Sequence, residues 1–193
     1  MNRRYLLTLL SVATLTACGG IPLRSIPRLM QLSGDLLQAQ PAEFRVAIQL
    51  DQRIAPPATS VPMLSIQLKP KVAGAFAPVD KKLPLQLAPA TEPAPTSAPP
   101  GPGRKWLIYS LPPATQAELS RIQAMVRHAQ SQPGYQKGGQ LSLGIEQTDL
   151  ALTQPQLADT EWSTWLQVKQ AEGYIQVWSG TPAQLLAMAQ TQR

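Results

Sequence analysis

Two stretches in which apolar and polar residues alternate constrain the fold of this chain more than any other feature. In residues 43–51 the apolar side chains fall on one face of an extended chain, and charged or amide side chains fall on the other. Residues 62–69 repeat the pattern. A period of two is typical of a β-strand with one buried and one solvated face, as in antiparallel sheets. We therefore expect a sheet with one wet side.

Three further segments predict strands. Residues 83–87 carry leucine at every second position, and Pro84 fits an edge because proline has no amide hydrogen to donate to a neighbouring strand. Residues 105–111 are apolar on both faces, which favours a central strand covered on two sides. Residues 140–146 alternate in the same way as the first two strands. Hairpin connections between these strands would make the sheet largely antiparallel.

The segment from 162 to 178 has two interpretations. Residues 162–169 and 173–178 fit a hairpin that turns near 171–173, and an amphipathic helix is the alternative. In a hairpin, Trp162 and Trp165 point to opposite faces, so one of them is exposed or covered by a partner. Aromatic side chains are more often core residues, but they also form ledges that bind ligands. We name Trp162, Trp165 and Trp178 as a possible binding surface.

Helices are predicted in three places. Residues 29–38 fit a brief helix. Thr115 and Glu118 are spaced as a capping box at the start of a second helix. Thr181, followed by Pro182, is the start signal of a third. The order of strands, helix, strands and helix predicts an α+β fold, with two or three helices packed on an antiparallel sheet.

Residues 88–103 are rich in proline, alanine and glycine. Such a segment does not pack a core, and we expect a disordered, extended loop. It is either a plain surface loop or a ligand for a partner domain. The three strands before it are too few for an independent domain, so we treat it as a loop within a single domain that covers residues 41–193.

The amino terminus has the three parts of a secretory signal. Arg3 and Arg4 form a positively charged beginning, residues 5–15 form an apolar run, and small residues precede Cys18. The apolar run is shorter than the roughly 20 residues that a membrane-spanning helix needs. We expect residues 1–17 to be a signal peptide that is removed.

The last four residues of that segment, Leu15-Thr16-Ala17-Cys18, resemble the lipobox of bacterial lipoproteins. The resemblance implies cleavage between Ala17 and Cys18, a diacylglycerol on the Cys18 thiol, and an acyl chain such as palmitate on the new amino terminus. Gly19 stands where inner-membrane lipoproteins carry aspartate, which implies the outer membrane, facing the periplasm. Residues 18–40 would then be a lipidated tether and short helix. The resemblance identifies no family for the mature domain.

The sequence offers little for catalysis. The only histidine, His128, cannot supply the three or four ligands of a zinc site, and we predict no metal and no cofactor. Two pairs of acids close in sequence, Glu146 with Asp149 and Asp159 with Glu161, are interpreted as surface groups. We expect no catalytic residues and therefore a protein that is not an enzyme.

The distribution of charge argues against one class of partner, nucleic acid. The chain has a formal net charge of +6, but its lysines and arginines are scattered. A nucleic-acid partner is not expected, because an exported protein rarely meets nucleic acid.

Three functions remain open at this point. The first is a membrane-anchored periplasmic lipoprotein with a non-catalytic binding or envelope-assembly role and an envelope protein partner. The second is an auxiliary lipoprotein subunit of an envelope transporter that carries an apolar ligand, for which a deep apolar cavity would speak. The third is an enzyme that acts on cell-wall or sugar substrates, for which two acids in one cleft would speak.

Overall fold

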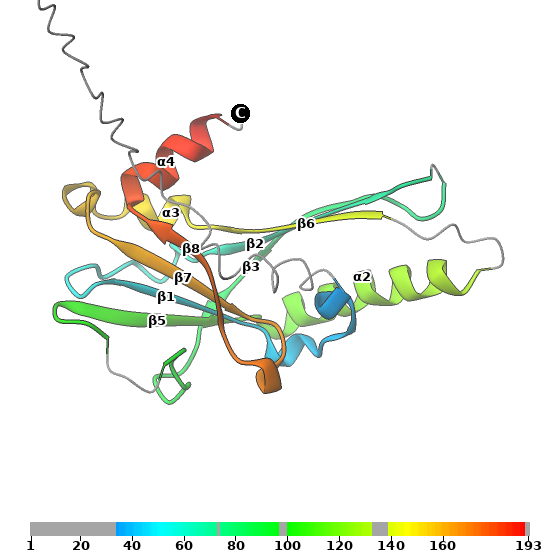
Figure 1. The fold of residues 1–193 in the computed structure, drawn as a ribbon, viewed down its shortest axis with the longest axis horizontal. Helices are drawn as coiled ribbons and strands as arrows, with labels where there is room; N and C mark the ends of the chain where they lie inside the picture. The colour runs from blue at the N-terminus through cyan, green and yellow to red at the C-terminus, as the bar shows by residue number, and fades with distance from the viewer. Residues whose placement is uncertain (1–33, 73, 97–99, 133–138, 192–193) are drawn as a thin grey trace, which may run out of the picture.

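Two antiparallel sheets make up the fold in the computed structural model, which describes residues 34–72, 74–96, 100–132 and 139–191. Sheet A has the order β4-β5-β1-β7-β8, and sheet B has the order β3-β2-β6 (Figure 1). The strands are β1 (Arg45–Asp51), β2 (Met63–Pro70), β3 (Val79–Pro84), β4 (Gln86–Leu87), β5 (Arg104–Ser110), β6 (Gly139–Glu146), β7 (Trp162–Gln167) and β8 (Ile175–Gly180). The predicted α+β class is confirmed.

The described residues form four helices. They are residues 34–38, α2 (Pro113–Ser131), α3 (Thr148–Leu152) and α4 (Pro182–Thr191), with short 3₁₀ turns η2 (Pro41–Glu43), η3 (Pro155–Leu157) and η4 (Gln170–Glu172). The first predicted helix is seen from residue 34, and the rest of it lies outside the described residues. None of the described helices is both long and apolar enough to cross a bilayer.

Strand β1 lies in the centre of sheet A, between β5 and β7. Its apolar side chains Val46, Ile48 and Leu50 are all 0% exposed, so the predicted alternation is confirmed. On β7, Leu166 lies opposite Val46 and shares this inner face. The inner face of sheet A is therefore one wall of the main core.

Sheet B supplies the opposite wall. Leu64 and Ile66 of β2 belong to the same core cluster as the inner residues of β1. Farther along β2, Leu68 packs with Phe76 and with Val126 of α2 in a second cluster. Figure 1 shows α2 lying beneath the extended part of sheet B. The outer side of sheet B is polar, as its strand pattern predicts.

The predictions of a single sheet and of one continuous strand over residues 83–87 are wrong. The structure has two sheets, and these residues are divided between them. Leu83 pairs with Leu64 in sheet B, whereas Gln86 pairs with Ser110 in sheet A. The chain crosses from one sheet to the other at Leu85, whose N–H donates to the Pro62 carbonyl and whose side chain is buried. Leucine at every second position indicates an extended chain, but it does not say which sheet each half joins.

The predicted capping box at Thr115 is also wrong. Helix α2 begins two residues earlier, at Pro113, where a proline fits the first helical position. The Thr115 side chain is buried, and its hydroxyl donates to the Pro84 carbonyl at 3.1 Å. Glu118 instead pairs with Lys81 of β3 and with Arg121. The residue types suited a cap, but contacts with sheet B determine their roles.

The start of α4 and the hairpin are confirmed. The Thr181 N–H donates to Gln184 Oε1 at 2.9 Å, and the Gln184 N–H donates to Thr181 Oγ1 at 3.3 Å, which is a capping box. Strands β7 and β8 pair antiparallel, so residues 162–178 are a hairpin and not a helix. Gly173 follows the turn with φ of 67°, a conformation that glycine adopts without strain.

Buried side-chain hydrogen bonds connect separate parts of the fold. Gln147, after β6, exchanges two hydrogen bonds with Thr164 of β7, at 2.9 and 3.1 Å. The Gln123 amide of α2 donates to the carbonyls of Leu36 and Ala39, which holds residues 34–39 against that helix. These bonds satisfy groups that would otherwise cost free energy when buried, so they favour one arrangement of sheets and helices.

Replacing Ile66 by alanine tests whether both sheets share one core. Ile66 is 0% exposed, and we expect the free energy of unfolding to fall by about 2–5 kcal/mol in urea titrations. The matched control is Leu152→Ala, because Leu152 is 55% exposed, and it should change stability by less than about 0.5 kcal/mol. Separate unfolding transitions for the two sheets would contradict a shared core.

Candidate functional site

A pair of tryptophans lies on the outer face of sheet A. We call Ala47, Trp106, Ile108 and Trp165 the tryptophan face. The Trp106 and Trp165 rings are 6.3 Å apart at 78°, an edge-to-face contact. Trp106 lies opposite Gln49 of β1 and Trp165 lies opposite Ala47, so the rings meet diagonally across β1. The small, fully buried Ala47 leaves room for the two rings above the strand.

Among the described residues, enclosed hydrogen-bond donors without a partner lie on both sides of sheet A, with the indole N–H groups of Trp162 and Trp178 on the inner side and four donors on the outer side. The indole N–H groups of Trp106 and Trp165, the Tyr174 hydroxyl and Arg104 Nε are enclosed and have no hydrogen-bond partner within the described part of the chain. An enclosed donor without a partner costs roughly 1–3 kcal/mol. Because these donor atoms are enclosed, the tryptophan face offers a partner the partly exposed apolar surface of Trp106, Ile108 and Trp165 and not the donors themselves.

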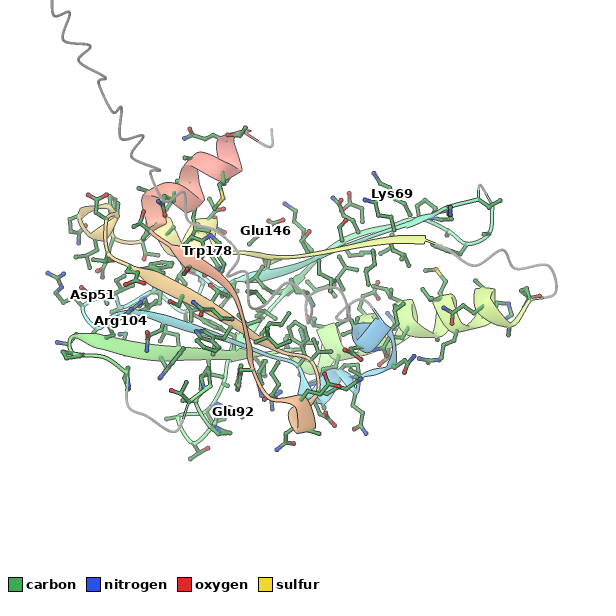
Figure 2. All side chains as sticks on the ribbon, in the orientation of Figure 1. Asp51, Lys69, Glu92, Arg104, Glu146 and Trp178 are labelled. Carbon is green, nitrogen blue, oxygen red and sulfur yellow. The ribbon has the colours of Figure 1, made fainter. Side chains whose placement is uncertain are left out.

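Two arginines lie at opposite ends of the face. At one end, Arg45 Nε donates to Glu92 Oε1 at 2.6 Å, and both side chains are largely buried. At the other end, Arg104 Nη2 donates to the Glu161 carbonyl at 2.7 Å. Figure 2 shows Arg104 beside Asp51, well away from Glu92. Each arginine is thus held by the protein next to the aromatic rings.

The proline-rich segment is attached to the same face where the structure describes it, in residues 88–96 and 100–103. The Ala88 N–H donates to the Ile108 carbonyl at 2.8 Å, and the Glu92 N–H donates to the Pro89 carbonyl at 3.0 Å. The ion pair of Glu92 with Arg45 adds a side-chain contact. The contacts of Ala88 and Glu92 hold the segment beside β5 and β1. The sequence predicted a disordered loop and did not predict these contacts.

The pKa of Tyr174 reflects the position of Glu92 in this segment. Burial, together with a smaller effect of the nearby Glu92 carboxylate, raises the pKa of Tyr174 to about 12, while Arg45 acts in the opposite direction. Tyr174 directly precedes β8, so Glu92 reaches from the proline-rich segment toward the far edge of sheet A. Burial also raises the pKa of Tyr109, in the core, to about 12.

The three tryptophans named from the sequence do not form one surface. Trp162 is 1% exposed and belongs to the core, and Trp178 lies opposite Thr164 on the inner side of sheet A. Trp165 is on the outer face, as expected for a residue an odd number of positions from Trp162. Its partner, Trp106, was not named as a site residue. The signal for Trp106 was the apolar pattern on both faces of residues 105–111.

The remaining candidates stay apart. Cys18 and Ala17 lie outside the described residues. His128 is exposed on α2, where its Nε2 is 3.2 Å from the Gln132 amide nitrogen. Glu146 pairs with Lys82 at 2.9 Å, and the Glu161 carboxylate lies 3.5 Å from Arg104. Among the described residues, no group of three or more histidine, cysteine, aspartate or glutamate side chains could hold a metal ion.

A hollow of about 50 Å³ lies on the outer face of sheet B. Its lining is polar, and consists of Gln67, Lys69, Gln140 and Ser142. Pockets for drug-sized ligands have volumes of about 300–1,000 Å³ and are mostly apolar. This hollow therefore does not suit an apolar ligand.

Comparison with known protein families, with curated proteins and with solved structures finds no match to this chain.

The Tyr174 pKa tests whether Glu92 of the proline-rich segment lies near Tyr174. In a Tyr109→Phe/Tyr135→Phe background, in which Tyr174 is the one tyrosine from Cys18 onward, Glu92→Gln should lower the Tyr174 pKa from about 12, because it removes the carboxylate, but not to the ordinary 10.0, because burial remains. The pKa is measured from tyrosinate absorbance in an alkaline titration. Since both tyrosine pKa values are raised, stability present below pH 10 should be lost as pH rises toward 12.

The control for this titration is Glu161→Gln, which removes a carboxylate at the Arg104 end of the face and should leave the Tyr174 pKa unchanged. An unchanged pKa in Glu92→Gln would mean that Glu92 does not lie near Tyr174 in solution.

Proposed function

We propose that the protein is a non-catalytic, lipid-anchored lipoprotein of the outer membrane, facing the periplasm, and that its folded domain binds an envelope protein through the tryptophan face. The Trp106–Trp165 pair is the observation that carries the binding role. The lipobox residues Leu15 to Cys18 support the anchor. Three acyl chains at Cys18 exceed the two lipid signals that stable membrane attachment requires.

The composition of the tryptophan face suits a protein partner. Tryptophan, tyrosine and arginine are the residues most enriched where interfaces gain their binding energy. Here Trp106 and Trp165, which are both partly exposed, supply rigid apolar area.

The other two functions have less support from the geometry. A carrier of apolar ligands needs a deep apolar cavity, and the hollow on sheet B is small and polar. A hydrolase of cell-wall sugars needs two acids in one cleft, whereas Glu146 and Glu161 each pair with a different cation. A transporter accessory that works by binding a protein subunit is compatible with the proposed role.

Replacing Cys18 by alanine tests the anchor. The variant should keep its first 17 residues and lose its lipid, because no thiol is available to accept diacylglycerol. Immunoblots of fractionated cells would show a longer protein that carries no labelled palmitate. A mature-sized Cys18→Ala protein in the membrane fraction would refute the lipid anchor.

A second experiment tests the tryptophan face. The lipidated protein is crosslinked in its own cells, purified, and compared with Trp106→Ala/Trp165→Ala. We expect a stoichiometric protein partner with the unaltered chain and at least a tenfold loss with the double variant, because hot-spot tryptophans each contribute roughly 2 kcal/mol or more. Val72→Ala/Leu152→Ala is the control, since both side chains are exposed and lie outside the face.

Thermal unfolding of the variants shows whether a loss of binding is a loss of fold. If the folded double variant retains the partner, or if the unaltered chain has none, the proposed role of the tryptophan face is wrong.

A further inference from the structure

The edges of the two sheets are protected to different degrees. An edge strand presents unpaired N–H and C=O groups, and proteins usually block it with charge, proline, a bulge or a very short strand. Sheet A ends in β4 and β8, and sheet B ends in β3 and β6.

Three of the four edge strands have a feature that blocks pairing with another strand. Strand β3 contains Asp80, Lys81 and Lys82 and ends at Pro84. Strand β4 has only two residues. Strand β8 has a register shift against β7 between Thr164 and Trp165, and such a bulge twists an edge away from regular pairing.

Strand β6 has no such blocking feature. It has eight residues, Gly139–Glu146, with no proline, and its single charge is at its last position. It pairs with β2 along its whole length without a register shift. Figure 1 shows it as the outermost strand of sheet B, extended alongside β2. Its free edge is therefore long, regular and nearly uncharged, which is the form of edge that accepts another strand.

We propose that β6 pairs antiparallel with β6 of a second copy of this chain, about a two-fold axis at Leu143. The two three-stranded sheets then form one sheet of six strands. This inference goes beyond the proposed function, because it concerns an edge of sheet B and does not involve the tryptophan face.

The sequence of β6 is complementary to itself in this register. Pairing about Leu143 places Leu141 opposite Ile145 and Ser142 opposite Gly144, so apolar residues meet apolar ones on the inner face and small residues meet on the outer face. Glu146 lies opposite Gln140, so two like charges do not meet. An axis between two residues would place inner residues opposite outer ones, which antiparallel pairing does not allow.

The inner side chains of β6 also favour a neighbour. Leu141, Leu143 and Ile145 face the core, yet each remains partly exposed. They are at the margin of the sheet, so no described strand covers them on the free side. A second β6 would bring the same three apolar residues against them and remove that surface from water. An interface of this kind is isologous, as in most two-fold dimers.

The test uses the lipidated full-length protein in detergent. Ser142→Lys/Gly144→Lys places four lysines together at the two-fold axis, and it should convert a dimer into a monomer, halving the mass measured by light scattering. Both positions accept a side chain: Ser142 is exposed, and a Cβ on Gly144 would meet Ser65 Cβ at 3.8 Å, an ordinary contact. Met63→Lys/Gln67→Lys is the control, on the same face of the central strand β2.

Cysteine crosslinking in cells checks the register. Ser142→Cys/Gly144→Cys should give a disulfide-linked dimer on a non-reducing gel, whereas Met63→Cys/Gln67→Cys should not. A monomeric unaltered protein, a dimer that persists in the folded lysine variant, or a disulfide to a different protein would each overturn the proposal. Trp106→Ala/Trp165→Ala should stay dimeric, so failure of this inference and failure of the proposed function are distinguishable.

Discussion

The burial of the middle of β1, where Val46, Ala47 and Ile48 are each 0% exposed, is the constraint on which the rest of the structure depends. Val46, Ile48 and Leu50 fill the inner side, and Ala47 is equally buried on the outer side. A strand buried on two faces also needs neighbours at both edges, because its backbone donors and acceptors cannot reach water. Strands β5 and β7 supply these neighbours, and each brings a tryptophan to the outer face. Core and candidate site therefore follow from one segment.

Local patterns predicted the elements better than their assembly. The alternation in residues 43–51 and 62–69 predicted two strands because it depends only on which face is buried. The start of α4 was predictable because Thr181 and Gln184 satisfy backbone groups three residues away. Thr115 has the same local chemistry, but a carbonyl of sheet B competes for its hydroxyl. The division of residues 83–87 between two sheets is likewise decided by contacts distant in sequence.

The sequence predicted only part of the candidate site, because contacts between residues distant in sequence decide the rest. The spacing of Trp162 and Trp165 required opposite faces, but the register with β1 decides which of them enters the core. Trp106 joins Trp165 only through β1, from a strand almost 60 residues away, and no local pattern contains that information. The arginine at each end of the tryptophan face is held in the same way, by Glu92 and by Glu161.

Contacts between the two ends of the described chain have a consequence for its synthesis. The Gln167 amide of β7 donates to the Glu43 carbonyl, and Lys169 pairs with Asp35, across 124 and 134 residues. Strand β1 therefore has no partner on one side until residues near 170 have left the ribosome. Such distant pairing folds slowly. Sheet A therefore closes late, and until then the inner apolar face of β1 is exposed along one edge of the growing fold.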